Sequence, residues 1–360
     1  MKPPVPPRME DVARALGVHR TTVSLALRHD PRIPEDTQKK VREAAERLGY
    51  RPNPLVTALM QQQRGRKPAR GVTTLAYLTS DTALEAWRRN AAYVEIFESA
   101  RTRAAGLGFR LEEFSLTRAG MNARRLRQIL HARGVRGVLL APPPGAESRV
   151  DIDLKGLAAV GLGLRIREPF IERVSTDHYQ AMRLALRACR ERGYHRPGLV
   201  VGDTASERIG HKWEAAFLVE HWLERSERMV PLLHGTINTP ERATPPDFHP
   251  WLKRHRPDVV LGTPSDRVKE WLEEIRAVAP RTGFISLGLR ERGGAVAGIW
   301  QNHARLGAMA VELLVAKLQR NEYDAEHATD THLVEGEWID GATLPRRGAG
   351  VEKDGKVRTS

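Results

Sequence analysis

The chain has 360 residues, which is enough for two or three domains. It holds 58 Lys and Arg against 44 Asp and Glu, a net charge of +14, and no run of 18 apolar residues, so no membrane-spanning helix is expected. The opening residues, MKPPVPPR, lack the apolar core of a signal peptide, and we interpret residues 1–8 as a disordered arm.

The positive charge is concentrated near the N-terminus. Residues 1–70 contain 15 basic and 7 acidic side chains and so carry +8 of the excess, although arginine is abundant throughout the chain. Such a basic segment is typical of a nucleic-acid-binding domain. The one cysteine, Cys189, lies in an apolar-periodic helix and is expected to be a small core residue, which suits a reducing cytoplasm.

Residues 9–52 have the pattern of a helix-turn-helix domain. The apolar spacing predicts two short helices, the second from about His19 to Arg28. Gly17 lies between them, can take a positive φ and ends the first helix. The side chains expected to face inward are Val12, Ala13, Leu16, Val23, Ala26 and Leu27.

A third helix is predicted to begin at Glu35 and Asp36, whose charges complement the helix dipole, and to end at Gly49. Its packing residues are expected to be Val41, Ala44, Ala45 and Leu48. After Arg51-Pro52, Asn53 can cap a further short helix that is apolar on one side. We interpret residues 53–71 as this hinge helix and a polar, basic linker, QQQRGRKPARG.

The DNA-contacting residues are predicted from the geometry of the motif. In a helix-turn-helix the N-terminal residues of the second helix touch base edges, which nominates Arg20, Thr21 and Thr22. Ser24 and Arg28 are better placed to contact phosphates. Such contacts position the domain on DNA but do not recognise its base sequence.

The order DVA, Gly-Val and TTVS, followed about two dozen residues later by LGYRPN, resembles the LacI/GalR family of bacterial transcription regulators. In that family the segment after YRPN is a hinge helix that forms on operator DNA, and a leucine from each protomer enters the minor groove. Leu59 stands at the matching position, and an apolar wedge there would unstack a base step. An ordinary packing leucine is the alternative. Tyr50 and Asn53, from the LGYRPN segment, complete the predicted DNA contacts.

The sequence departs from the family pattern at three positions in the head. Arg8 stands near the position where relatives start the first helix with Thr or Ser. Leu25 stands where relatives carry a polar residue, and Pro34 stands where the third helix usually has a Ser-type cap. The operator sequence therefore does not follow from the resemblance.

From residue 72 on, short apolar runs alternate with amphipathic helices, which is typical of a parallel α/β sheet. Strands are expected at 74–79, 111–114, 138–141 and 158–162, with helices at 91–107 and 123–133. A second lobe is expected to open at 174–177, with helices at 180–192, 208–224 and 267–278 and strands at 199–201, near 230, and at 259–261 and 284–287. A long amphipathic helix at 304–319 and a last strand at 332–334 are expected to follow.

Two similar α/β halves suggest a periplasmic-binding-protein-like fold with two lobes and parallel sheets, which the family also has. The predicted organisation is an all-α helix-turn-helix head with a hinge helix, then an effector-binding and dimerisation domain over residues 72–340. The chain is expected to cross between the lobes near 162–176 and 288–302, and residues 341–360 are expected to form a flexible tail.

In open α/β sheets ligands bind at the carboxyl ends of strands, here in the cleft between lobes. This rule and the resemblance nominate Ser80, Asp81, Arg208, Ser265, Asp266 and Arg290 as effector contacts. In sugar- and purine-sensing relatives an arginine at the position of Arg208 grips the ligand. Arg290 replaces an aspartate of relatives, which shifts the expected ligand towards an acid, a phosphate or a sugar acid, with a solvated loop charge as the alternative.

An enzyme would need a recognisable site. The chain has no Walker loop, no Gly-x-Ser-x-Gly and no His-Glu-x-x-His, and Gly161-Leu162-Gly163 lacks the third glycine of a dinucleotide loop. We therefore expect no catalytic residue, cofactor or metal. A periplasmic sugar-binding protein would share the body fold, but the head and the missing signal peptide argue against it.

The sequence thus predicts a cytoplasmic bacterial regulator, a repressor rather than an activator, that associates with the nucleoid when bound. Its expected partners are a near-palindromic double-stranded operator, a second copy of the chain, and a small-molecule effector (a sugar, sugar acid or related metabolite), but no membrane. The effector can be an inducer, which weakens DNA binding, or a co-repressor, which strengthens it. Each needs only to bind one conformation of the protein better than the other.

Overall fold

The computed structural model describes residues 9–27, 33–48, 73–80, 86–117, 121–143, 149–224, 229–264, 266–320, 322–323 and 330–347. Internal contacts divide the chain into two units, a head of residues 1–71 and a body of residues 72–360. The predicted arm, hinge helix and linker lie outside the described residues. Within those residues, no helix is both long and apolar enough to cross a membrane.

The head contains the helices α1 (Met9–Leu16), α2 (Arg20–Ala26) and α3 (Glu35–Arg47). Its small core is built from the predicted inward-facing side chains, of which Val12, Val23, Ala26, Val41 and Ala44 are fully buried. A turn between α1 and α2 brings these faces together. Gly17 has a φ of +65°, so its predicted role in ending α1 is confirmed.

Two expectations for the head are wrong in detail. The helix α2 is shorter than predicted, because it begins after the N-cap His19 and ends at Ala26, with Leu27 as its C-cap. Leu48 does not belong to the core: α3 ends at Arg47, and the Leu48 side chain, in the turn that follows, is 38% exposed.

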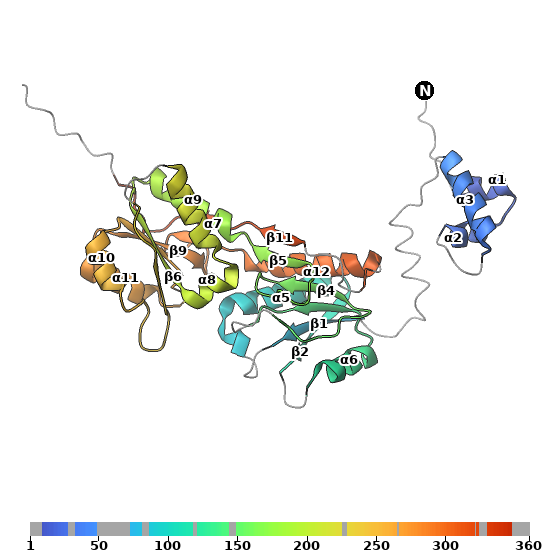
Figure 1. Ribbon diagram of the computed structural model, residues 1–360, viewed down its shortest axis with the longest axis horizontal. Helices are drawn as coiled ribbons and strands as arrows, with labels where there is room; N and C mark the ends of the chain where they lie inside the picture. Colours follow the sequence, from blue (N-terminus) through green and yellow to red (C-terminus); the bar gives the residue numbers. More distant parts are fainter. Residues whose placement is uncertain are drawn as a thin grey trace, which may run out of the picture. The chain divides into compact units, whose positions relative to one another are not determined.

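The first lobe of the body contains the six-stranded sheet β11-β5-β4-β3-β1-β2, in which all described pairs are parallel. Its strands are β1 (Thr73–Thr79), β2 (Phe109–Ser115), β3 (Gly137–Leu140), β4 (Ala158–Leu162), β5 (Arg173–Thr176) and β11 (Thr331–Val334). Its helices are η1 (Ala86–Arg89), α5 (Ala91–Gly106), α6 (Ala123–Ala132) and α12 (His303–Arg320). The helices α5 and α12 cover one face of the sheet and α6 the other (Figure 1).

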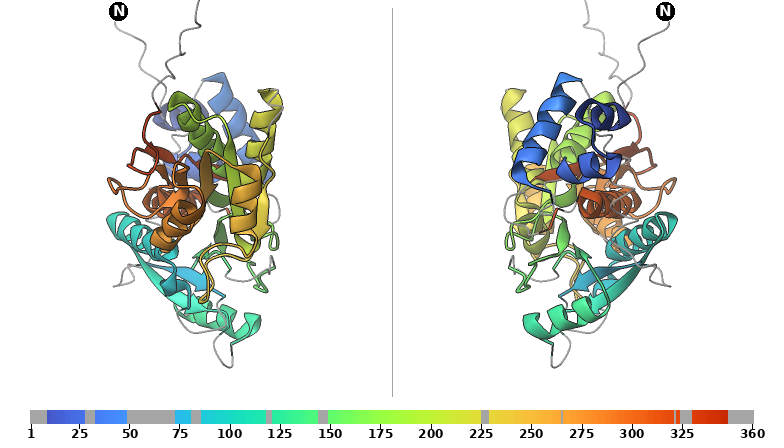
Figure 2. Two further views of the ribbon diagram at one scale, coloured as in Figure 1. Left: turned by 90° about the vertical axis from the view of Figure 1, so that its left-hand side faces the viewer. Right: turned by 90° about the vertical axis from the view of Figure 1, so that its right-hand side faces the viewer.

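The second lobe contains the sheet β12-β10-β9-β8-β6-β7, which is parallel except for the antiparallel pair β10 and β12. Its strands are β6 (Pro197–Gly202), β7 (Leu233–Gly235), β8 (Val259–Gly262), β9 (Gly283–Leu289), β10 (Gly298–Trp300) and β12 (Glu337–Ile339). Its helices are α7 (His178–Glu191), α8 (Asp203–Ile209), α9 (Lys212–Leu223), α10 (Phe248–His255) and α11 (Val268–Val278). The pair α7 and α9 packs on one face and the pair α10 and α11 on the other. Figure 2 views the molecule end-on.

The central strands β3, β4, β6 and β8 are buried along their whole length, which is why they read as continuous apolar runs. In β1, Leu75 and Tyr77 join the core under α5 and α12, whereas Ala76 and Leu78 join the core over α6. Successive side chains of a strand point to opposite faces, so one strand supplies two cores.

The expected lobe boundary is wrong. Residues 174–177 do not open the second lobe, because β5 pairs with β4 and β11 in the first sheet. In the described part of the chain, the backbone crosses between lobes three times: from β5 to α7, from β10 to α12 and from β11 to β12. A strand followed by a helix looks the same in sequence whether or not the chain changes lobe between them.

Smaller elements also differ from the prediction. The helix expected over 208–224 is two helices, α8 and α9, because Gly210 and His211 both take positive φ. The strand expected near Val230 is β7, three residues later. The sequence interpretation missed α10, β10 and β12.

The expectation that residues 341–360 form a flexible tail is wrong for residues 341–347, and residues 348–360 lie outside the described residues. Leu344 is 2% exposed in the core of the second lobe, and the Tyr194 hydroxyl donates to the Pro345 carbonyl at 3.0 Å. The Arg347 amide donates to the carbonyl of Arg192 at 2.9 Å. Residues 341–347 are therefore part of the second lobe.

Candidate functional site

The head presents the first turn of α2 as its candidate DNA-contacting surface. The Thr21 amide donates to Nδ1 of His19 at 3.3 Å, so a histidine caps this helix. Because Nδ1 accepts that N–H, the Thr21 hydroxyl, 2.7 Å away, donates to it as well. Thr21 is exposed and Thr22 half-buried. The side chains of Arg20 and Ser24, and all of Arg28, Tyr50, Asn53 and Leu59, lie outside the described residues, so their DNA contacts stay predictions.

The body contains a cavity of about 210 Å³ between its two lobes. The first lobe contributes residues from α5, the start of α12 and the loops after β3 and β4, and the second contributes residues from α7, α8 and α9 and the loops after β8 and β9. The polar side chains that line it are Asn90, Tyr93, Glu95, Arg165, Ser175, Thr176, His178, Arg208, Trp213, Thr263, Arg290, Gln301 and His303.

The cavity lies where strand topology places ligand sites. Pro142, Arg165 and Thr263 follow the carboxyl ends of β3, β4 and β8, and Arg290 and Gln301 follow those of β9 and β10. Loops at this edge of a parallel sheet converge, because every strand runs the same way. Side chains far apart in sequence therefore meet around one space.

Two of the predicted effector residues, Arg208 and Arg290, line this cavity. Ser80, at the end of β1, and Asp266, exposed in the turn before α11, do not line it. Asp81 and Ser265 lie outside the described residues.

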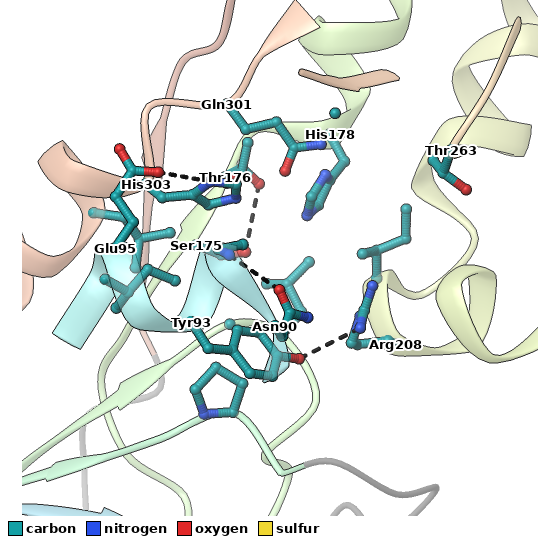
Figure 3. A pocket seen from close by; sticks show the side chains of 18 of the residues that line it. Asn90, Tyr93, Glu95, Ser175, Thr176, His178, Arg208, Thr263, Gln301 and His303 are labelled. Atoms are coloured by element: carbon teal, nitrogen blue, oxygen red, sulfur yellow. Dashed lines mark hydrogen bonds and ion pairs between the residues drawn. The ribbon is translucent and has the colours of Figure 1, made fainter. Parts of the chain in front are cut away.

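Arg208 links the two lobes. It lies in α8 of the second lobe, and its Nη1 donates to the hydroxyl of Tyr93, on α5 of the first lobe, at 3.4 Å. Figure 3 shows the guanidinium extending across the cavity towards the Tyr93 ring. This is a long hydrogen bond, so Arg208 can exchange it for a ligand group at little cost.

His178 is held neutral at the start of α7. It is 8% exposed and packs edge-to-face on Trp213, with ring centroids 5.3 Å apart. Burial, and then the positive charge of Arg208, lowers the pKa of His178 to about 3. The Nδ1 of His303 is 3.6 Å from a Glu95 carboxylate oxygen, and Figure 3 draws this contact.

Arg165 is the cation that the sequence interpretation missed. It is 6% exposed, in the loop after β4, and burial followed by the charge of Arg208 lowers the pKa of its guanidinium. The carboxyl-end rule contained the signal, because Arg165 comes three residues after the strand predicted at 158–162. The burial of His178 had no comparable signal in the sequence.

The lining is strongly positive. Arg165, Arg208 and Arg290 face the cavity, and the carboxylate among the described lining residues, Glu95, is paired with His303. No group of three His, Cys, Asp or Glu side chains able to hold a metal ion occurs within the described residues. The arrangement suits recognition of a small polar molecule.

Comparison with known proteins shows which family the head resembles. The family model described as "Bacterial regulatory proteins, lacI family" matches residues 8–53. "Probable HTH-type transcriptional repressor ExuR" of Bacillus subtilis (strain 168) is 44% identical over 55 residues, which are 15% of this chain and 16% of that protein. The match to this curated relative thus spans about a sixth of its length, within the DNA-binding region.

Solved structures give the fold of the whole chain. The transcriptional regulator CelR in complex with cellobiose has a TM-score of 0.53 at 19% identity, covering 94% of this chain and 99% of that one. The Lac repressor dimer bound to operator and the anti-inducer ONPF has a TM-score of 0.51 at 17% identity, covering 95% and 100%.

The chain thus combines a lacI-type helix-turn-helix head with a two-lobed, periplasmic-binding-protein-like body, the architecture of these solved regulators. The head matches the lacI family of bacterial regulatory proteins, so the resemblance drawn from the sequence is confirmed there, and the solved structures show that the body shares the fold of such regulators.

Proposed function

We propose that the chain is a sequence-specific DNA-binding repressor of the bacterial cytoplasm that acts as a homodimer on a near-palindromic operator. A small-molecule effector, bound between the two lobes, controls its affinity for DNA. The observation that carries this proposal is the presence, in one chain, of a lacI-type head and a two-lobed body with a polar cavity at the carboxyl ends of its strands.

The DNA side of the proposal rests on charge and symmetry. Residues 1–70 carry a net +8, which attracts the phosphate backbone, and α2 presents Thr21 at its exposed first turn. A two-fold dimer would place one head on each half of a two-fold site. The Lac repressor, whose fold this chain shares, was solved as a dimer on its operator. We assign base contacts to Arg20, Thr21 and Thr22 and the minor-groove wedge to Leu59.

The effector side rests on the cross-lobe cavity. CelR, which has the same fold, was solved with cellobiose. In our chain Arg208 and Tyr93 face each other across the two lobes, so a ligand between them would contact both. A ligand that binds one arrangement of the lobes better shifts the population towards it, and the DNA affinity changes accordingly.

The test is selection of bound sequences from random double-stranded DNA by the purified full-length chain, between 50 and 200 mM salt. We expect an enriched near-palindrome, with an affinity that falls roughly 10³-fold or more over this salt range if six or more phosphates are contacted. Removing residues 1–71 provides the control and should abolish binding. Salt-sensitive binding without an enriched sequence, with and without added cell metabolite extract, would overturn the proposal.

A further inference from the structure

Four side chains around the cavity have a buried polar atom without a hydrogen-bond partner in the described protein. These atoms are Nη1 of Arg165, Nδ1 of His178, Nε1 of Trp213 and Oγ1 of Thr263. Buried polar groups in native proteins are almost always paired, so four such atoms around one cavity point to a ligand that pairs them. Arg165 and Trp213 can only donate, so that ligand must present acceptors.

The charges around these atoms decide what kind of acceptor fits. Arg165 is 6% exposed and forms no ion pair or hydrogen bond within the described residues, although a guanidinium without a partner is costly to bury. Arg208 enters the same cavity from the other lobe. Glu95, the lining carboxylate, is engaged by His303 at 3.6 Å. Two cations therefore face one space, and neither forms an ion pair within the described residues; the carboxylate acting on Arg165 is that of Glu207, which is exposed and does not line the cavity.

We propose that the effector is a small organic anion, whose carboxylate or phosphate group binds between Arg165 of the first lobe and Arg208 of the second. This inference rests on the proposed function, because it takes the cavity as the effector site. A guanidinium donates two parallel hydrogen bonds to either group, and the donors from both lobes would then converge on one anion.

The same arrangement couples the anion to lobe closure. Without an ion-pair partner, Arg165 and Arg208 repel each other across the cavity, and this repulsion favours separation of the lobes. An anion between them turns this repulsion into two attractions and favours a closed body. His178, held neutral, can hydrogen-bond the ligand without adding a third buried positive charge.

Arg165, rather than Arg290, makes the cavity select an anionic ligand over a neutral one. Arg290 is exposed, so water already solvates its charge whether or not a ligand is present. Arg165 is buried, so a neutral ligand would leave its charge uncompensated. A site with buried unpaired donors rejects analogues that lack the matching acceptor, and we expect at least tenfold discrimination against a neutral sugar.

The experiment measures thermal unfolding and calorimetric binding of the full-length chain with gluconate, glucuronate, glucose 6-phosphate and inorganic phosphate. Glucose is the matched neutral probe, and chloride is used to equalise ionic strength. The variants are Arg165→Met and, as a control, Arg110→Met, whose wild-type side chain is 65% exposed on β2. Carboxylate probes and phosphate probes form separate arms and identify the group that is bound.

We expect at least one anionic probe to raise the Tm of the wild type and of Arg110→Met, with glucose at least tenfold weaker. Arg165→Met should lose this response while its ligand-free Tm is equal to or above that of the wild type, because it no longer buries an uncompensated charge. Loss of the anion response with an unchanged or raised ligand-free Tm would show that Arg165 binds the ligand. If Arg165 only stabilised the fold, its replacement would lower the ligand-free Tm.

Three results would overturn the anion site: glucose binding as tightly as the acids, an anion response that survives in Arg165→Met, or no probe whose effect depends on Arg165. These results leave the operator selection untouched. If an enriched operator is found but the anion response fails, only the effector class is wrong, whereas failure of the selection removes the proposed function itself.

Discussion

At the scale of single residues, His178 shows how the fold sets a protonation state. It is buried against Trp213 with a pKa near 3, whereas in the unfolded chain a histidine titrates near 6.5. Between these values the unfolded state binds more protons than the folded state, so stability falls as pH falls. Arg208, His303 and Lys212 each lower this pKa as well, because they add positive charge around the ring.

The His178→Asn variant tests this effect. At pH 5, about 1.5 units below the unfolded value, His178 should destabilise the folded wild type by about 2 kcal/mol relative to pH 7. Between pH 7 and pH 5, the free energy of unfolding should fall by about 2 kcal/mol less in the variant than in the wild type. Urea unfolding at pH 7, 6 and 5 measures this difference. His234→Asn is the control, because His234 is 42% exposed. Parallel profiles for wild type and His178→Asn would contradict the buried neutral histidine.

The roles of residues that depend on nearby sequence, such as turns, helical spacing and strand ends, could be predicted from the sequence. Gly17 and the buried face of the head followed from turn chemistry and helical spacing, and Arg208 followed from the strand-end rule together with the family resemblance. Arg165 and His178 could not be separated from solvated charges. Their burial is produced by segments that only the folded chain brings together.

At the scale of elements, α5 and α12 pack more closely than two ordinary helices can. Gly307 makes this approach possible, since a Cβ at that position would overlap the carbonyl oxygen of Ile96 and the hydroxyl of Ser99. The contact lies over the face of the first sheet that carries the core residues of β1 and β4. The spacing of these helices therefore depends on one absent side chain.

Replacing Gly307 by alanine should lower the free energy of unfolding by about 1–3 kcal/mol, because the added methyl group meets backbone atoms that cannot rotate away. Gly106→Ala, in the last turn of α5, offers a matched control: no atom lies within 4 Å of its Cβ position, and the change should stabilise by about 0.5–1 kcal/mol. Denaturant unfolding of both variants measures the difference. Equal changes in the free energy of unfolding for the two variants would show that the close contact at Gly307 does not affect stability.

Most elements of the body were predictable because parallel strands buried on both faces and amphipathic helices leave strong periodic patterns. The three-residue strands β10 and β12 were not, since each is defined by its neighbours rather than by its own residues. Nor did any local pattern show that β11 returns to the first sheet.

At the scale of the whole molecule, the proposed regulation requires that a change in the body alters DNA binding by the head. Arg208→Ala should still bind the selected operator but lose its response to the effector, because Arg208 reaches into the proposed effector cavity of the body rather than the head. Fluorescence anisotropy with labelled operator measures both quantities.

Tyr93→Phe removes the same hydrogen bond between lobes but keeps the cation. If the response depends on the charge of Arg208, Tyr93→Phe retains it. A response that persists in Arg208→Ala would mean that the effector binds elsewhere.

The third crossing between lobes has a consequence for synthesis of the chain on the ribosome. The three helices of the head are complete once residue 48 has emerged, but the first lobe receives its strand β11 only at residues 331–334, and the second receives β12 and residues 341–347 later still. Proteins fold from the N-terminus as they are made. A growing or prematurely terminated chain therefore carries a complete head before its body is complete, so under the proposed function the response to an effector is the last property that the protein acquires.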